Sequence, residues 1–216
     1  MKTIAIDADG PLLDGREKHF ACYQFIAERL GFEPLDGKTY WQLKRERTPL
    51  EKLLALTNAE INPTDFKRLW QDHIESPEFL DLDKLQDEAL AKFKAWHGAG
   101  FCLTVSSLRQ SFDKLTDQLE SFGILSTIKK VIVTSAERGG RGKAEAFLEQ
   151  LPKNSSNELL WIGDTEVDIE SARFIGCPIW ALSCGLRSAD FLSRFKPDFL
   201  SKNIGEVEPE KVWNPQ

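Results

Sequence analysis

The sequence predicts an α/β protein in which a doubly wound parallel sheet forms the core and an all-helical domain is inserted near the start of the chain. After residue 82, short apolar runs of strand length alternate with helical patterns, which is the rhythm of a parallel sheet with right-handed crossovers. Another apolar run lies at residues 3–6, and from residue 20 to residue 74 the pattern is helical without a clear strand. We therefore expect the core in residues 1–15 and 82–216, and the inserted domain in residues 16–81.

The first predicted strand ends in two carboxylates, Asp7 and Asp9, and the following Gly10 and Pro11 break regular structure. In a strand these two acids would share one face. A strand buried in a parallel sheet reads as a continuous apolar run, and open α/β sheets bind ligands at the carboxyl ends of their strands. The inserted domain would then lie over the two acids. Alone, the pattern also fits an Asp-rich turn.

The inserted domain is expected to contain helices. Apolar residues at three- and four-residue steps predict a first helix that ends at Gly31. Residues 31–48 read as turn-rich, and a second helix follows around residues 50–54. A third helix is expected to be capped by Thr64 and to end before Pro77.

The second half of the chain is expected to alternate between helices and strands. The predicted helices cover residues 85–96, 108–122, 143–151 and 166–174, and residues 139–142 read as a flexible glycine-rich loop. The predicted strands cover residues 101–105, 131–133, 159–162, 178–182 and 198–200, the last at the sheet edge. The first of these is expected to stop at Ser106 and Ser107.

Composition excludes several classes of protein. The chain has 216 residues, of which 41% are hydrophobic and 29% charged, as in ordinary globular proteins. A net charge of −6 argues against a general nucleic-acid binder. No apolar run is long enough to span a membrane, and the start does not resemble a signal peptide. The four cysteines are scattered, without the pairing of a zinc site. We expect a cytoplasmic protein, monomeric or homodimeric.

Four strand ends carry residues suited to phosphoryl transfer, and in this order they resemble the haloacid dehalogenase superfamily. Its first motif, D-x-D-G-x-L, matches the segment from Asp7 to Leu12, and its fourth, G-D-x-x-x-D, matches the segment from Gly163 to Asp168. The weaker second motif, an apolar strand ending in Ser or Thr, matches Ser106, and the third, a lysine that opens a helix, matches Lys143. The helical insertion is similar to the cap of the phosphoglycolate phosphatase and β-phosphoglucomutase branch.

The resemblance implies a phosphatase with a haloacid dehalogenase-like core and a helical cap. Asp7 would attack phosphorus and form an aspartyl-phosphate, and Asp9 would act as general acid and then as general base. Lys143 and Ser106, with Ser107 beside it, would bind phosphate oxygens. Asp7, Asp164 and the main-chain carbonyl of Asp9 would hold Mg²⁺, and Asp168 would accept a hydrogen bond from Lys143 or from metal-bound water.

Each of these residues also has a purely structural interpretation. Ser106 and Ser107 could cap the next helix, Lys143 could be a solvated helix residue, and Asp164 with Asp168 could form an acidic first helical turn. All of these would have to hold at once, at strand ends in one order. Pro11 departs from the residues usual in the family and removes an amide donor from the turn.

The first functional prediction is hydrolysis of a small phosphorylated metabolite. An acid at position 9 disfavours a dehalogenase, because a carbon–halogen bond needs no protonation of its leaving group. A phosphomutase with the same intermediate, a phospho-switch of the response-regulator type and a non-catalytic binding protein remain as alternatives, the last favoured only by Pro11.

The resemblance also gives a role to a basic cluster in the inserted domain, formed by Lys44, Arg45 and Arg47. In the resembling families, this part of the cap contacts the non-reacting end of the substrate. An arginine could hold a carboxylate or second phosphate by two parallel hydrogen bonds, and Lys44 would act as a point charge. The alternative is a charged loop in solvent. The binding interpretation predicts a substrate with an anionic or strongly polar group beyond its scissile phosphate.

Overall fold

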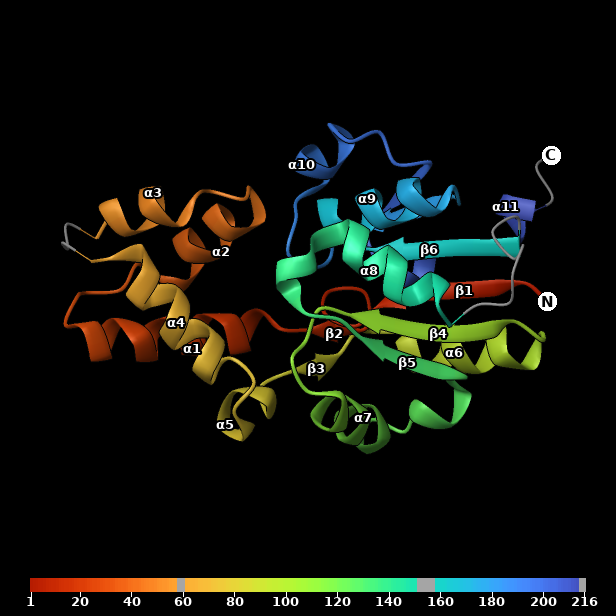
Figure 1. The fold of residues 1–216 in the computed structure, drawn as a ribbon, viewed down its shortest axis with the longest axis horizontal. Helices are drawn as coiled ribbons and strands as arrows, with labels where there is room; N and C mark the ends of the chain where they lie inside the picture. The colour runs from red at the N-terminus through yellow and green to blue at the C-terminus, as the bar shows by residue number, and fades with distance from the viewer. Residues whose placement is uncertain (58–60, 151–157, 214–216) are drawn as a thin grey trace. The chain divides into compact units, whose positions relative to one another are not determined.

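The protein is described from a computed structural model, and the structure describes every residue except 58–60, 151–157 and 214–216. The chain divides into two compact units (Figure 1). The core unit consists of Met1–Leu13 and Leu85–Gln216, and the helical unit consists of Asp14–Lys84. No helix in the described ranges is both long and apolar enough to cross a membrane.

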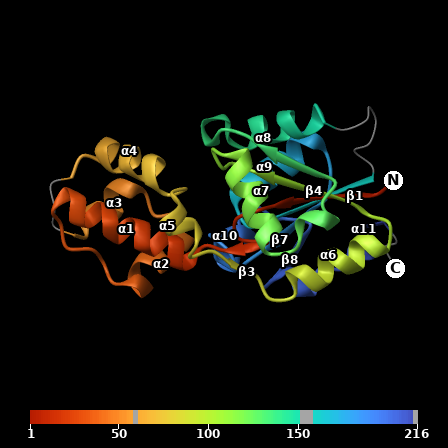
Figure 2. The ribbon, with the colours of Figure 1, turned by 90° about the horizontal axis from the view of Figure 1, so that it is seen from below.

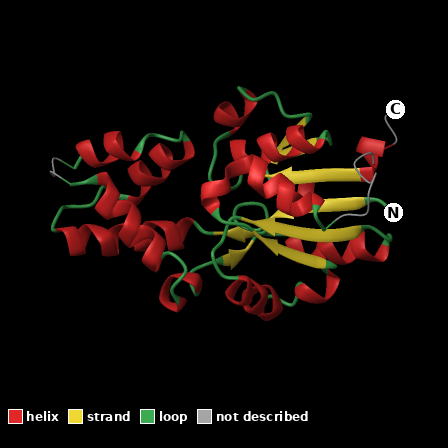
Figure 3. Ribbon diagram, viewed as in Figure 1, coloured by secondary structure: helices red, strands yellow, loops and turns green. Residues whose placement is uncertain are grey.

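In the described part of the core unit, parallel strands form a six-stranded sheet, drawn in yellow in Figure 3. The strand order is β5-β4-β1-β6-β7-β8. The strands are β1 (Thr3–Asp7), β4 (Cys102–Ser107), β5 (Lys130–Val133), β6 (Leu159–Gly163), β7 (Ile179–Leu182) and β8 (Phe199–Ser201). The first strand is central and fully buried, as its continuous apolar run predicts. The predicted doubly wound parallel sheet is confirmed.

Helices cover both faces of this sheet (Figures 1 and 2). On one face, α6 (Ala89–Gly98) and α7 (Phe112–Ser121) pack against Ile4 and Ile6 of β1. On the other face, α8 (Gly139–Leu148) and α9 (Glu166–Ile175) pack in the cluster that contains Ala5. Successive residues of β1 therefore face opposite layers, which fixes the register of the central strand.

Short elements complete the core unit. They are α10 (Ala189–Ser193), α11 (Glu210–Trp213) and the 3₁₀ helices η1 (Leu125–Thr127), η2 (Ala136–Arg138) and η4 (Ile204–Glu206). The chain passes between the units at β2 (Leu13–Asp14) and β3 (Lys84–Leu85), which form a separate two-stranded sheet.

The helical unit has its own hydrophobic core. Its helices are α1 (Arg16–Leu30), α2 (Gly37–Arg45), α3 (Leu50–Ala55), α4 (Pro63–His73) and α5 (Pro77–Leu80). Stacked rings of Tyr23 and Tyr40, with centroids 4.3 Å apart, join α1 to α2. The first helix ends at Gly31 with a left-handed backbone, as predicted.

Two predictions for the helical unit are wrong. Residues 31–48 are not simply turn-rich, because α2 forms there with Asp36 as its N-cap, whose side chain accepts hydrogen bonds from the amides of Lys38 and Thr39. The cap of α4 is Asn62 rather than Thr64: the Asn62 side chain accepts a hydrogen bond from the Thr64 amide. Thr64 is the second residue of the helix, two positions after the cap.

Several predicted boundaries in the core unit are also wrong. The glycine-rich residues 139–142 are the first turn of α8 rather than a flexible loop. The sixth helix begins at Ala89, since Leu85 lies in β3, and α7 begins only after Ser111, which caps it. Residue 151, the predicted end of the helix that carries Lys143, lies outside the described residues.

Candidate active site

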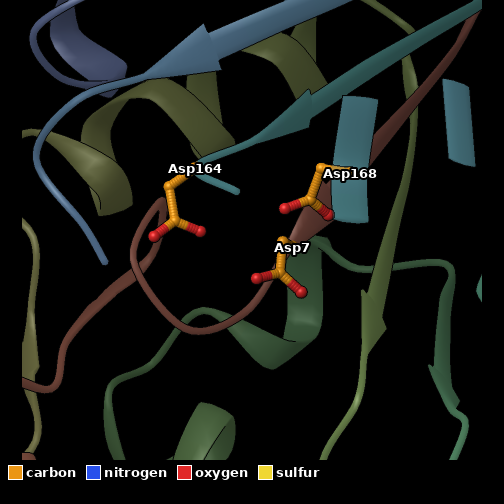
Figure 4. Close-up of side chains that lie close together, drawn as sticks. All are labelled: Asp7, Asp164 and Asp168. Carbon is orange, nitrogen blue, oxygen red and sulfur yellow. The ribbon is translucent and has the colours of Figure 1, made fainter. Parts of the chain in front are cut away.

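The register of the sheet brings the predicted site residues together at its carboxyl edge. Asp7 is the last residue of β1 and pairs with Ser106 of β4. Asp164 follows β6 directly, and Asp168 lies in the first turn of α9. Asp7, Asp164 and Asp168 are buried, and one carboxylate oxygen from each lies within 4.8 Å of the others (Figure 4). We call these three residues the acidic cluster.

Lys143 lies against the acidic cluster and is 2% exposed. Its Nζ donates hydrogen bonds to Oδ1 of Asp7 (2.5 Å) and to Oδ1 of Asp168 (2.8 Å). The solvated-helix interpretation of Lys143 is therefore wrong. Because the Lys143 ammonium is buried between Asp7 and Asp168, it can contact a bound ligand only beside these two carboxylates.

Asp168 acts through its hydrogen bonds to other protein groups. Its Oδ1 also accepts from Nε1 of Trp161 (3.3 Å), and its Oδ2 accepts from the amide and hydroxyl of Thr165 (3.2 and 2.7 Å). Thr165 and Asp168 form a capping box at the start of α9. With both oxygens occupied by protein donors, Asp168 is suited to hold Lys143 in place rather than to bind a metal ion directly.

Asp164 is suited to bind a metal ion. Its Oδ2 accepts a hydrogen bond from the amide of Leu186, whereas its buried Oδ1 has no hydrogen-bond partner among the described residues. A Cβ added at Gly10 or Gly185 would overlap the Asp164 carboxylate, so the backbone approaches it closely on both sides. A buried, unpaired carboxylate oxygen next to two more carboxylates is a donor set that hard cations prefer.

The charge balance of the cluster points the same way. Three carboxylates face one ammonium, so a divalent cation would neutralise the group. Burial raises the pKa of Asp7 to about 7, although Lys143 draws it down. Burial, with the charges of Asp7 and Asp168, raises the pKa of Asp164 well above its ordinary value. Burial alone would lower the pKa of Lys143, but Asp168 and Asp7 together hold it above its ordinary value.

Ser106 presents a hydroxyl that the described protein residues leave unused. The side chain is fully buried, and its Oγ has no hydrogen-bond partner among the described residues. The helix-capping interpretation of Ser106 and Ser107 is wrong, because both residues belong to β4 and Ser111 caps α7. Ser107 Oγ instead accepts a hydrogen bond from the amide of Arg109 (3.3 Å). Of the two serines, Ser106 is the one placed beside Asp7.

A family model described as haloacid dehalogenase-like hydrolase matches residues 1–176. The chain belongs to this family. Among curated proteins, it is similar to phosphoglycolate phosphatases of Vibrio cholerae and Vibrio vulnificus, and each is 25% identical to it. Both alignments span 96% of this chain; they span 95% of the Vibrio cholerae protein and 94% of the Vibrio vulnificus protein. The predicted enzyme class, a phosphoric monoester hydrolase, is confirmed at this level.

Solved structures show the same fold. A haloacid dehalogenase-like hydrolase from Streptococcus pneumoniae superposes with a TM-score of 0.76 at 18% identity, with 99% of this chain and 97% of that chain covered. A predicted phosphatase from Clostridium acetobutylicum gives a TM-score of 0.76 at 15% identity, with 99% of each chain covered. The fold is therefore that of haloacid dehalogenase-like hydrolases.

In this hydrolase, the side chain of Asp9 is turned to a residue that the sequence did not single out. Arg109 donates two hydrogen bonds to the Asp9 carboxylate, and a third to Oε1 of Gln118. Its position just after the strand that carries Ser106 was the only feature of the sequence that could have indicated a role for Arg109. Nothing in the sequence pairs it with position 9.

Pro11 is accommodated in the turn after β1. The turn is closed by hydrogen bonds from the amide of Gly10 to the carbonyl of Leu13 (2.9 Å) and from the amides of Leu12 and Leu13 to the carbonyl of Ala8 (3.3 and 3.0 Å). None of these requires a donor at position 11. Pro11, which was the only feature that favoured a non-catalytic protein, therefore leaves these hydrogen bonds of the turn intact.

The basic cluster belongs to the helical unit. Lys44 and Arg45 lie in the last turn of α2, and Arg47 follows it with a left-handed backbone (φ 54°). The Lys44 ammonium lies 4.1 Å from the ring centroid of Trp70. Lys44 therefore packs on an aromatic ring as well as carrying charge.

Proposed function

We propose that this hydrolase is a Mg²⁺-dependent phosphatase that hydrolyses a small phosphorylated metabolite through an aspartyl-phosphate intermediate on Asp7. The observation that carries the proposal is the position of Asp7. Its buried carboxylate accepts a hydrogen bond from Lys143 and lies beside Ser106, whose hydroxyl has no hydrogen-bond partner among the described residues. It also belongs to the acidic cluster, in which one oxygen of Asp164 likewise has no partner in the described part of the chain.

The chemistry follows in two steps. In the first, an Asp7 oxygen attacks phosphorus, the bond from phosphorus to the leaving oxygen breaks, and Asp9 gives its proton to that oxygen. In the second, water attacks phosphorus, Asp9 takes a proton from the water, and the bond to Asp7 breaks to release inorganic phosphate. Lys143 and Ser106 would stabilise the charge that accumulates on the phosphoryl oxygens.

Asp7 and Asp164 would hold Mg²⁺, with the main-chain carbonyl of Asp9 as a further oxygen ligand. When bound, the ion neutralises charge between the carboxylates and the phosphoryl group. Asp168 holds Lys143 through the 2.8 Å hydrogen bond and so keeps the ammonium directed at Asp7.

For the substrate, the relatives named phosphoglycolate phosphatase suggest 2-phosphoglycolate as the first compound to test. It carries a carboxylate beyond its scissile phosphate, which is the kind of second anionic group expected from the basic cluster. The proposal for this chain is the broader class: a small phosphomonoester with an anionic or strongly polar group at its non-reacting end.

The experiment compares Asp7→Asn with Asp9→Asn in Mg²⁺, with EDTA as the control for metal dependence. Asp7→Asn should lose several orders of magnitude in turnover, because an amide is a poor nucleophile. After incubation with 4-nitrophenyl phosphate, whose leaving group needs little protonation, intact-mass spectrometry should find a phosphate adduct on Asp9→Asn and none on Asp7→Asn. An adduct on both variants, or full turnover by Asp7→Asn with an unchanged circular dichroism spectrum, would show that the nucleophile is a different residue.

A further inference from the structure

Arg109 forms a two-pronged hydrogen bond with Asp9. Its Nε donates to Oδ2 of Asp9 and its Nη2 donates to Oδ1, both at 2.7 Å. Two parallel bonds between the planar guanidinium and the planar carboxylate fix the orientation of the carboxylate as well as its position. A lysine could supply the charge but not this planar match.

The guanidinium is itself held on a third side. Its Nη1 donates to Oε1 of Gln118 on α7 at 2.7 Å, and the Arg109 side chain is 5% exposed. Gln118 thus fixes Arg109, and Arg109 fixes Asp9. All three residues belong to the core unit, so this chain of contacts lies within one compact unit.

Arg109 and Lys143 each pair with an aspartate of the first motif. Lys143 provides the hydrogen-bonded positive charge beside Asp7 and Asp168. The Arg109 guanidinium donates hydrogen bonds to Asp9 and Gln118. Arg109 therefore contacts the side chain that is proposed to move protons.

We infer that Arg109, fixed by Gln118, is a positioning residue for proton transfer by Asp9. This inference rests on the proposed function, in which Asp9 protonates the leaving oxygen and then activates water. An acid–base group works only within hydrogen-bond reach of the proton that it transfers. Asp9 is followed by Gly10 in a left-handed conformation (φ 101°), and the planar match to Arg109 fixes the carboxylate beside this turn.

The test is a double-mutant cycle of Arg109→Lys and Asp9→Asn, measured in Mg²⁺ with 4-nitrophenyl phosphate and with an alkyl phosphomonoester. Arg109→Lys should lower kcat for the alkyl substrate by roughly 10- to 100-fold, a fraction of the full acid–base contribution. The steady-state KM of Arg109→Lys for the alkyl substrate should stay within about 2-fold of that of the unmodified protein. With 4-nitrophenyl phosphate, Arg109→Lys should release nitrophenolate in an initial burst and then accumulate the phosphate adduct. The reason is that activation of water is slowed whereas departure of the aryl group is not.

In the Asp9→Asn background, the same Arg109→Lys change should lower the rate of adduct formation from the alkyl substrate by less than about 2-fold, because Arg109 then has no proton-transferring carboxylate to position. Gln118→Leu should repeat the pattern of Arg109→Lys more weakly, and it provides a second route if Arg109→Lys does not fold. Arg173→Lys is the control, because Arg173 also pairs with an aspartate, Asp198, but at an exposed site.

Three results would overturn the inference. Equal losses from Arg109→Lys in both backgrounds, or a raised KM in both, would mean that Arg109 binds the phosphate itself. A lowered melting temperature with unchanged kcat would mean that the pair only stabilises the fold. Absence of Mg²⁺-dependent phosphatase activity in the unmodified protein would instead refute the proposed function, and this is established before any variant is compared.

Discussion

At the scale of single residues, the site depends on how closely the backbone approaches Asp164. A Cβ at Gly185 would overlap Oδ2 of Asp164 and would lie 2.6 Å from Cα of Gly10. The neighbouring Leu186 amide donates to the same carboxylate. The loop after β7 can therefore fix Asp164, the proposed metal ligand, only if residue 185 has no side chain.

We predict that Gly185→Ala weakens Mg²⁺ binding by roughly 10- to 100-fold, the effect usual for groups that orient a metal ligand. The added methyl group must displace the Asp164 carboxylate or the loop. The measurement is the Mg²⁺ concentration that gives half of the maximal rise in melting temperature. Gly98→Ala is the matched control, because a Cβ at Gly98 meets nothing within 4 Å. An unchanged midpoint for Gly185→Ala would show that the site does not use this carboxylate.

Some of these residues could be predicted from the sequence and others could not. Asp7, Ser106 and Asp164 were predictable because the ends of parallel strands meet at one edge of a sheet. The contact between Asp9 and Arg109 was not, because it depends on where a loop side chain turns after its strand ends. Main-chain groups, such as the Leu186 amide that bonds Asp164, leave no mark in the sequence at all.

At the scale of elements, the first turn of α8 explains why glycine content misled the prediction for residues 139–142. A Cβ at Gly140 would lie 2.6 Å from the carbonyl oxygen of Val167 on α9, and the Gly140 carbonyl accepts a hydrogen bond from Ser171 Oγ (2.8 Å). Glycine is needed at this position for close packing of two helices, not for flexibility. That packing holds the helix that carries Lys143.

The end of α2 carries the prediction for substrate choice. We expect Arg47→Ala to raise KM for 2-phosphoglycolate by roughly one to two orders of magnitude, which is the contribution of a charged hydrogen bond. The change should barely affect 4-nitrophenyl phosphate, which lacks a second anionic group. Arg68→Ala serves as the control, because Arg68 is an exposed arginine of the same unit that pairs with Asp65. Equal effects of Arg47→Ala on both substrates, or none on either, would leave the cluster as a charged surface.

At the scale of the whole molecule, the parallel sheet was predictable from the sequence, and the charge balance at its edge was not. Apolar runs of strand length that alternate with helical patterns predict a parallel sheet. In such a sheet, the carboxyl ends of the strands meet at one edge. Whether the acids at that edge would be buried depends on the layers that cover both faces, which only the folded chain defines. Their burial is what links the site to the stability of the entire core unit.

This link predicts how stability depends on pH and on Mg²⁺. Without a cation, burial raises the pKa of Asp7 from 3.8 to about 7, and the pKa of Asp164 moves in the same direction. Between these pH values the folded protein keeps a proton that the unfolded chain releases, so this contribution to the free energy of unfolding falls as pH rises from about 4 to about 7. For Asp7 alone, the full loss is on the order of 4 kcal/mol above pH 7.

Mg²⁺ should reverse this loss, because the cation compensates the carboxylates that burial disfavours. The rise in melting temperature between EDTA and Mg²⁺ should therefore be larger at pH 8 than at pH 5. Comparing the two conditions at one pH removes the contributions of all groups that do not contact the ion. Asp164→Asn should abolish most of the difference, since it removes both a buried charge and a ligand. A Mg²⁺ effect that is equal at both pH values, or greater at pH 5, would mean that the acidic cluster is not where the ion binds.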